Sequence, residues 1–339
     1  MRFSASAFAP ACASPNHCEA DPLRLYPDAS NGEAVVTRYR VFPGMRLDYR
    51  DVHARACREL RDGSGERLEI HHCLEGRVEY RQNGRYFYLS PGDLAVARTS
   101  SLPPDSRFPT GHYHGITVTI DPAAAPECLS CILSDVEVRP ATLMEKLCPG
   151  GTVFTARSSR RVKHVFSELY AVPEDIRKGY LKVKLLELLL FLSTLSPEDG
   201  QTPHGCTSTQ VTLAEQVKAR LLAEPDRTLT LKSLSQQFNV SEAQIKSSFA
   251  GVYGMSPAAY ARSQRMHGAA ALLRETDRTV LDIACQFGYD NASKFARAFR
   301  DVIGVSPREY RAGAEYDSCA PQLGEKPVSL SDADVERRI

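Results

Sequence analysis

Apolar residues recur every three to four positions through the last third of the chain, and this helical pattern occurs there twice. The first copy spans residues 231–257 and the second spans residues 281–307, and each predicts two helices separated by a tight turn. In each second helix two apolar residues stand four positions apart and share one face: Ile245 with Phe249, and Phe295 with Phe299. Two copies of a helix-turn-helix unit predict a chain that binds DNA.

The residues at the turns fit this interpretation. A tight turn needs a residue that tolerates a left-handed backbone, and Gly288 and Asn239 are suited to that conformation. Ser241 and Asn291 stand where a side-chain oxygen can accept hydrogen bonds from the first N–H groups of the next helix. The alternative is that the two units are plain helical hairpins of a bundle, but the duplication favours DNA binding.

If the apolar residues are buried, the opposite faces of the two second helices point outward and become the candidate DNA-binding residues. On the first helix these are Ala243, Gln244, Lys246 and Ser247, and on the second they are Ser293, Lys294, Arg297 and Arg300. Arginine can form paired hydrogen bonds with guanine, whereas alanine offers only an apolar contact. We therefore expect the second helix to contribute more to base discrimination than the first.

At residues 212–312 the sequence resembles the AraC/XylS family of bacterial transcription regulators. The helix between the two units carries the family pattern Y-x4-R-[LM]-x2-A-x2-LL at Tyr260, Arg265, Met266, Ala269, Leu272 and Leu273. The segment GVSPREYR at residues 304–311 matches the closing signature of the family. The resemblance implies a sequence-specific DNA-binding regulator, more often an activator than a repressor, that responds to a small-molecule effector and works with RNA polymerase.

The N-terminal part of the chain shows a different pattern, with short alternating segments between about residues 35 and 121. The segments 68–74 and 77–82 alternate around Gly76, and Asn83-Gly84 is a strong hairpin signal. Successive short strands with Gly and Pro turns predict a small β-barrel or jelly roll. The family resemblance implies a cupin-like sensor here. The expected fold class is multidomain α+β, with a cupin-like β-barrel and helical segment followed by an all-α double helix-turn-helix domain.

The expected domains follow from these patterns. Residues 156–172 and 178–195 have helical spacing, and the second segment is apolar around much of its circumference. That helix either packs within its own domain or forms a homodimer, the use that the resemblance implies. The expected boundaries are a disordered leader at 1–30, a sensor at 31–125, a helical or dimerisation segment at 126–195, a linker at 196–211, a DNA-binding domain at 212–312 and a disordered tail at 313–339.

Histidines on the predicted strands are the candidates for an effector site. His72 shares a strand face with Leu68 and Ile70, and His114 shares one with Ile116 and Val118, so both are expected to face the interior of the barrel. We consider an effector pocket formed by His72, Tyr80 and His114, although hydrogen-bonded core histidines explain the same pattern. No glutamate follows at the spacing of metal-binding cupins, so no metal and no cofactor are expected.

Composition limits the remaining possibilities. The chain has 339 residues, 42% of them hydrophobic and 24% charged, with a net charge of +1, which is typical of a globular protein rather than a uniformly basic nucleic-acid coat. The pair Cys128 and Cys131 forms a lone CxxC that predicts free thiols more strongly than zinc or redox chemistry. No segment is long and apolar enough to span a membrane, and a cytoplasmic protein is expected. An enzyme is not expected. The alternative is a cupin-type metal enzyme or effector-binding protein with an appended DNA-binding domain.

Overall fold

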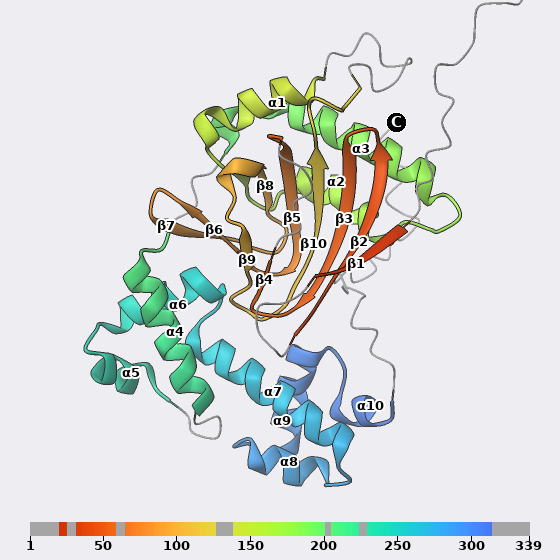
Figure 1. Cartoon of the computed structure of the whole chain (residues 1–339). Helices are drawn as coiled ribbons and strands as arrows, with labels where there is room; N and C mark the ends of the chain where they lie inside the picture. Colours follow the sequence, from red (N-terminus) through yellow and green to blue (C-terminus); the bar gives the residue numbers. More distant parts are fainter. Residues whose placement is uncertain are drawn as a thin grey trace, which may run out of the picture. The chain divides into compact units, whose positions relative to one another are not determined.

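A seven-stranded antiparallel sheet forms the centre of the N-terminal half in the computed structural model, which describes residues 20–25, 32–58, 65–126, 138–200, 205–223 and 229–313 (Figure 1). Its strands, in spatial order, are β1 (Ala20–Leu25), β2 (Glu33–Phe42), β3 (Met45–His53), β10 (Tyr113–Ile120), β5 (Leu68–Gly76), β8 (Leu94–Arg98) and β11 (Phe154–Ala156). Two smaller sheets pair β4 (Ala56–Arg58) with β9 (Asp105–Arg107) and β6 (Val78–Gln82) with β7 (Arg85–Leu89). Strand pairing among the described residues does not close these sheets into the expected barrel.

Strand β1 corrects the expectation that residues 1–30 are a disordered leader. Residues 20–25 pair antiparallel with β2, from Ala20 opposite Tyr39 to Leu25 opposite Ala34. The strand contains Pro22 and lies at the edge of the sheet, where a residue without a backbone N–H is tolerated. Its only large apolar residues are Leu23 and Leu25, which is a weak local signal for a strand, and the pairing with β2 was not visible in the sequence. Residues 1–19 lie outside the described residues.

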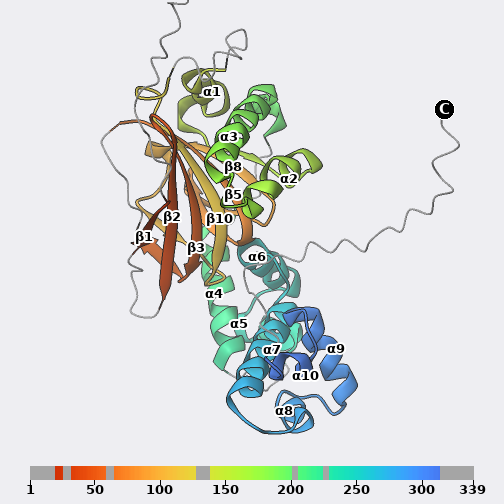
Figure 2. The ribbon, with the colours of Figure 1, turned by 90° about the vertical axis from the view of Figure 1, so that its right-hand side faces the viewer.

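Both faces of the large sheet are buried, against different partners. The even-numbered residues of β5 and β10, including Ile70 and Ile116, pack under helices α1 (Pro140–Leu147), α2 (Arg160–Ser167) and α3 (Arg177–Thr194). Figure 2 shows these helices on one side of the sheet. The odd-numbered residues, including Cys73 and Tyr113, pack with side chains of β4 and β6. The helix-covered face is therefore not the face that packs against β4 and β6. His72 and His114 are even-numbered residues of β5 and β10, so they lie on the helix-covered face.

Helix α3 packs within its own chain. Its buried leucines, spaced at three and four residues, join the core beneath the helices: Leu181, Leu185, Leu188, Leu189 and Leu192. Val183 lies on another side of the helix and is 62% exposed. The structure therefore confirms internal packing of this segment and leaves a second, partly apolar face outside that core. The expected homodimer stays a prediction.

The last third is helical, as the sequence predicts. The first helix-turn-helix unit contains α5 (Leu231–Phe238) and α6 (Glu242–Tyr253) and is preceded by α4 (Ser208–Ala223). The second contains α8 (Val280–Gln286) and α9 (Ala292–Ile303), follows α7 (Pro257–Glu275) and is closed by α10 (Pro307–Arg311). Short 3-10 helices occur at Thr99–Ser101, Pro149–Gly151, Glu168–Ala171 and Pro197–Asp199. Within the described ranges, no helix is long and apolar enough to cross a membrane.

The chain divides into two compact units between the two helix-turn-helix motifs. The first unit comprises residues 1–219 and 230–257, and the second comprises residues 220–229 and 258–339. The first motif thus belongs with the sensor sheet, and the expected boundary at residue 212 stays a prediction. Cys128, Cys131 and the expected tail beyond residue 313 lie outside the described residues.

Candidate DNA-binding surface

The two turns have the geometry that the sequence predicts. Asn239 ends α5 with a φ of 51°, and Gly288 follows α8 with a φ of 80°, so both adopt the left-handed backbone. Ser241 Oγ accepts a hydrogen bond from the backbone N–H of Gln244 at 3.1 Å. Asn291 Oδ1 accepts one from the N–H of Ser293 at 2.8 Å. Each turn therefore fixes the direction of the helix that follows it.

The recognition helices α6 and α9 bury corresponding faces. Ile245 and Phe249 are fully buried in α6, and Phe295 and Phe299 are fully buried in α9. Every residue predicted to face DNA is exposed: Ala243, Gln244, Lys246, Ser247, Ser293, Lys294, Arg297 and Arg300. The burial pattern that the spacing predicts is therefore present in both helices. Their contacts with bases stay a prediction.

The two exposed faces differ in charge. Helix α6 carries one acidic residue, Glu242, and one basic residue, Lys246. Helix α9 carries Lys294, Arg297 and Arg300 against a single acidic residue, Asp301. Among the described residues, the Arg297 side chain makes no hydrogen bond or ion pair, so it can turn toward a ligand. The second helix therefore offers the stronger site for the phosphates and guanines of DNA.

Helix α7 approaches the second motif closely at Gly268. A Cβ atom at this position would lie 3.1 Å from the ring of Phe287, so glycine lets α7 and the end of α8 pack together. Within the second unit this packing joins Met266, Ala269 and Leu273 of α7 to the buried rings of α9. Gly268, which lowers helix propensity, thus has a packing role that the sequence pattern does not reveal.

The three residues predicted to line an effector pocket do not meet at one place. His72 stacks on Phe166 with ring centroids 4.2 Å apart and lies 2.8 Å from the hydroxyl of Tyr170 through Nδ1. Burial lowers the pKa of His72 to about 4, so its ring is neutral at pH 7. Tyr80 is buried with the residues of the opposite sheet face. His114 is the second residue of β10, with Nε2 3.6 Å from Asp51 Oδ1.

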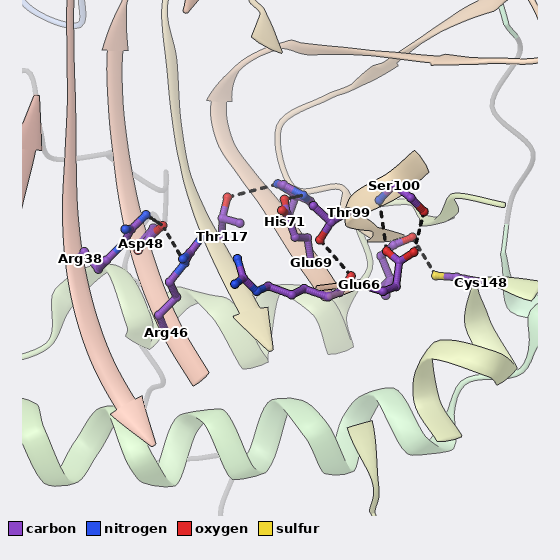
Figure 3. A network of polar contacts seen from close by, with 12 residues as sticks. Arg38, Arg46, Asp48, Glu66, Glu69, His71, Thr99, Ser100, Thr117 and Cys148 are labelled. Carbon is purple, nitrogen blue, oxygen red and sulfur yellow. Dashed lines mark hydrogen bonds and ion pairs between the residues drawn. The ribbon is translucent and has the colours of Figure 1, made fainter. Parts of the chain in front are cut away.

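A buried polar row crosses the sheet on the face opposite the helices, and sequence reasoning missed it (Figure 3). Arg38, Asp48, Thr117 and His71 stand opposite one another on the neighbouring strands β2, β3, β10 and β5. Arg38 donates two hydrogen bonds to the Asp48 carboxylate, at 2.9 and 3.0 Å. His71 lies 3.2 Å from the Thr117 hydroxyl and 3.1 Å from Glu69. The sequence signal for this row was that polar Glu69 and His71 alternate with apolar Leu68 and Ile70, so the two polar residues share one face of the strand.

Sensor residues contact the first helix-turn-helix unit within the first compact unit. Arg77, just before β6, donates a hydrogen bond from Nη1 to the carbonyl oxygen of Ala250 at 3.3 Å, in the last turn of α6. Tyr86 of β7 and Cys206 exchange backbone hydrogen bonds of 2.9 and 2.8 Å. Lys218 of α4 donates to the carbonyl oxygen of Pro109 at 2.9 Å. The β6–β7 hairpin therefore contacts the segment that leads into α4, and Arg77 beside it contacts the recognition helix α6.

Comparisons with known proteins agree with this double helix-turn-helix architecture. A model of the family described as a helix-turn-helix domain matches residues 234–313. The transcriptional regulator Rob of Salmonella typhimurium is 32% identical over 93 residues, which cover 27% of this chain and 32% of Rob. The arabinose operon regulatory protein of Escherichia coli is 23% identical over 275 residues, covering 76% of this chain and 83% of that protein.

Among solved structures, a probable AraC family transcriptional regulator from Rhodopseudomonas palustris is 31% identical, with 30% of this chain and 95% of that chain covered and a TM-score of 0.28. The class that the fold and the matches define is the double helix-turn-helix transcription regulators. Within that class, the C-terminal DNA-binding domain of this chain is of the AraC type, as the resemblance predicted. It spans about a third of the length of Rob.

Proposed function

We propose that this chain is an effector-responsive transcription activator that reads two successive major grooves of double-stranded DNA with α6 and α9. The observation that carries the proposal is the pair of matched recognition helices, each capped, buried on one face and polar on the other. Helix α7 runs without interruption from Pro257 to Glu275, which corresponds to roughly 28 Å at the usual rise per residue. That length suits motifs about one turn of DNA apart.

The effector site that we propose lies between the β6–β7 hairpin and β11. A small pocket with a cavity volume of about 20 Å³ is lined there by Tyr80 and other residues: Gln82, Phe87, Tyr88, Leu89, Asp93, Val153, Thr155, Ala156 and Arg157. The pocket as it stands has room for about one water molecule, so a ligand would enter by displacing its side chains. Its aromatic walls suit a ligand with an apolar body. Of the three residues proposed from sequence, Tyr80 lines this pocket, whereas His72 and His114 lie elsewhere.

The hairpin that forms this pocket also contacts the first DNA-binding motif. Tyr80 belongs to β6, and Phe87 and Tyr88 belong to β7, which pairs through Tyr86 with Cys206 ahead of α4. Arg77 reaches the carbonyl group of Ala250 in α6 from the same hairpin. A ligand that shifts the hairpin would therefore change the position of α6, which gives the effector a direct route to DNA binding.

We further propose a homodimer through the outer side of α3. Val183, Leu186 and Leu190 follow a spacing of three and four residues along α3, and each is at least partly exposed. These residues form the partly apolar face that the internal core leaves uncovered. RNA polymerase is the further partner that the family resemblance implies. The cytoplasm, where bacterial DNA lies, is the proposed site of action, and DNA binding rather than catalysis is the proposed activity.

Genome-wide binding of the tagged full-length protein tests the DNA-binding proposal. We expect discrete sites, each with two protected segments about 10 base pairs apart in footprints. The fragment 212–312 should retain binding that weakens steeply with salt, because phosphate contacts release counterions. Binding without salt dependence, or a single short protected segment, would overturn the two-groove assignment. The genes beside the sites would then identify promoters for a reporter.

Filling the pocket tests the effector proposal. Ala156→Leu adds a side chain to the pocket wall, and Ala171→Leu adds the same atoms at an exposed position outside it. In a reporter driven by an identified promoter, we expect Ala156→Leu to abolish the response to growth conditions while DNA affinity stays within about twofold of the unmodified protein. The Ala171→Leu control should respond normally. An unchanged response in Ala156→Leu would show that the effector binds elsewhere.

A further inference from the structure

Two histidines and an aspartate gather on the helix-covered face of the sheet, where β3 and β10 lie side by side (Figure 1). Asp51 of β3 stands directly opposite His114 of β10 in the strand register. His53 follows Asp51 by two residues along β3, so its side chain projects from the same face. The three side chains are therefore brought together by backbone pairing and not by a flexible loop.

The donor atoms of the three residues lie close together. His53 Nε2 lies 3.0 Å from Asp51 Oδ1, and His114 Nε2 lies 3.6 Å from the same oxygen. One ligand atom from each residue lies within 4.8 Å of the others. Protein ligands of a zinc ion lie about 2.0–2.2 Å from it in a tetrahedral arrangement, which places neighbouring ligand atoms roughly 3.3–3.6 Å apart. The separation of 3.6 Å lies at the upper end of that range, and the separation of 3.0 Å is slightly below it.

Hydrogen bonding within the cluster does not account for this arrangement. Asp51 Oδ1 is buried and accepts no hydrogen bond among the described residues, although His53 Nε2 is only 3.0 Å away. A ring N–H that donated to this oxygen would have to point along the line between the two atoms. The arrangement instead leaves a carboxylate oxygen and two imidazole nitrogens within 4.8 Å of one another, with no hydrogen bond to that oxygen.

We propose that Asp51, His53 and His114 bind one divalent transition-metal ion. Two imidazoles and one carboxylate suit zinc, cobalt, nickel or iron(II), whereas magnesium and calcium prefer oxygen ligands alone. Three protein ligands leave at least one coordination position for water or a small anion. The side chains of Asp51 and His53 are 47% and 58% exposed, so the ion has a path from solvent.

This site was not expected from the sequence. The pair Asp51 and His53 gives only a D-x-H pattern, and His114 lies more than 60 residues further along the chain. Only the register of β3 against β10 brings the third ligand to the other two. The site is also separate from the pocket lined by Tyr80, so the inference does not rest on the proposed function.

Cobalt(II) binding to the full-length, metal-stripped protein tests the proposal. We expect one equivalent to bind with visible d–d absorption and without the near-ultraviolet thiolate-to-cobalt bands that cysteine ligands give. Zinc should displace the cobalt. His53→Gln, Asp51→Asn and His114→Gln should each weaken binding by about tenfold or more, because each removes a metal ligand. His164→Gln, an exposed histidine 3.9 Å from Glu187, is the matched control and should bind as tightly as the unmodified protein.

Several results would overturn the proposal. One is no cobalt or zinc binding by the unmodified protein, which would show that the cluster is not a metal site. Another is a thiolate spectrum, which would assign the metal to cysteines. A third is unchanged affinity in His53→Gln. Because His53 is largely exposed, that variant should keep the circular dichroism spectrum of the folded protein and decide the question even if Asp51→Asn or His114→Gln unfolds.

Discussion

The two helix-turn-helix units have the same local geometry but different surroundings. In both, a left-handed residue makes the turn, a polar side chain caps the second helix, and two apolar residues anchor it. The end of α6 accepts a hydrogen bond from Arg77 of the sensor hairpin, and the first motif shares a compact unit with the sensor sheet. The second motif has its own core around Phe295 and Phe299.

Their recognition faces differ in a corresponding way. Helix α6 presents small or weakly charged side chains, Ala243 and Ser247 among them, whereas α9 presents Arg297 and two further basic residues. A shared backbone geometry therefore does not imply a shared role. We interpret the first motif as the one that responds to the sensor and the second as the one that discriminates bases, and the following predictions test that division.

The largest expected effect concerns the anchors of the recognition helices. Phe299 is fully buried, so Phe299→Ala should destabilise the second motif by about 3–5 kcal/mol. Phe249→Ala removes the corresponding anchor of α6 and should cost a similar amount. Hydrogen exchange of the full-length protein would locate each loss: we expect faster exchange in α9 for Phe299→Ala and in α6 for Phe249→Ala. Equal acceleration in both helices for either variant would contradict two separate cores.

The next effect concerns base discrimination. Arg297→Ala should weaken binding to the preferred site by about 1–3 kcal/mol and relax the sequence preference, because a guanidinium can form two hydrogen bonds to guanine. Ser247→Ala, in α6, should cost less. Binding-site selection with both variants measures this difference. If Arg297→Ala lowers affinity equally for all sequences, Arg297 contacts only phosphate and the proposed division of roles fails.

The same comparison shows why some features could be predicted from the sequence. The helix-turn-helix geometry is local: the positions of Asn239, Ser241, Gly288 and Asn291 determine the turns and caps within a few residues. The predicted helices, their caps and their exposed faces were therefore confirmed. Burial of the four apolar anchors followed from a spacing of four residues, which a helix converts directly into a shared face.

The sensor was harder to predict because its geometry depends on long-range pairing. The alternation of apolar and polar residues identified the strands. Because both faces of the large sheet are buried, that alternation did not reveal which face a ligand could reach. His72 was assigned to a barrel interior and instead stacks on Phe166 under the helices. The cluster of Asp51, His53 and His114 depends on the register of two strands, which no local pattern specifies.

A smaller effect separates the two turns. Gly288 has a φ of 80°, and a Cβ atom added there would have open space, so Gly288→Ala should cost only the backbone strain of about 1–2 kcal/mol. Asn239→Gly should leave the stability of the first motif unchanged or raise it slightly, since glycine adopts the same backbone without a Cβ penalty. Thermal unfolding of the two variants provides the measurement. Equal destabilisation by both would show that side-chain contacts, rather than the backbone, set the cost at these turns.

The smallest expected effect lies at one buried position that differs between the motifs. Ser248 of α6 and Ala298 of α9 each directly precede the second anchor of their helix, and both are buried. Ser248 Oγ has no hydrogen-bond partner among the described residues, whereas alanine has no such atom to satisfy. Because a buried hydroxyl without a partner is unfavourable, Ser248→Ala should stabilise the first motif by about 1 kcal/mol. Ala298→Ser should destabilise the second by about the same amount. Hydrogen exchange of α6 and α9 would resolve the two changes, and a destabilising Ser248→Ala would mean that the hydroxyl makes a contact on which the first motif depends.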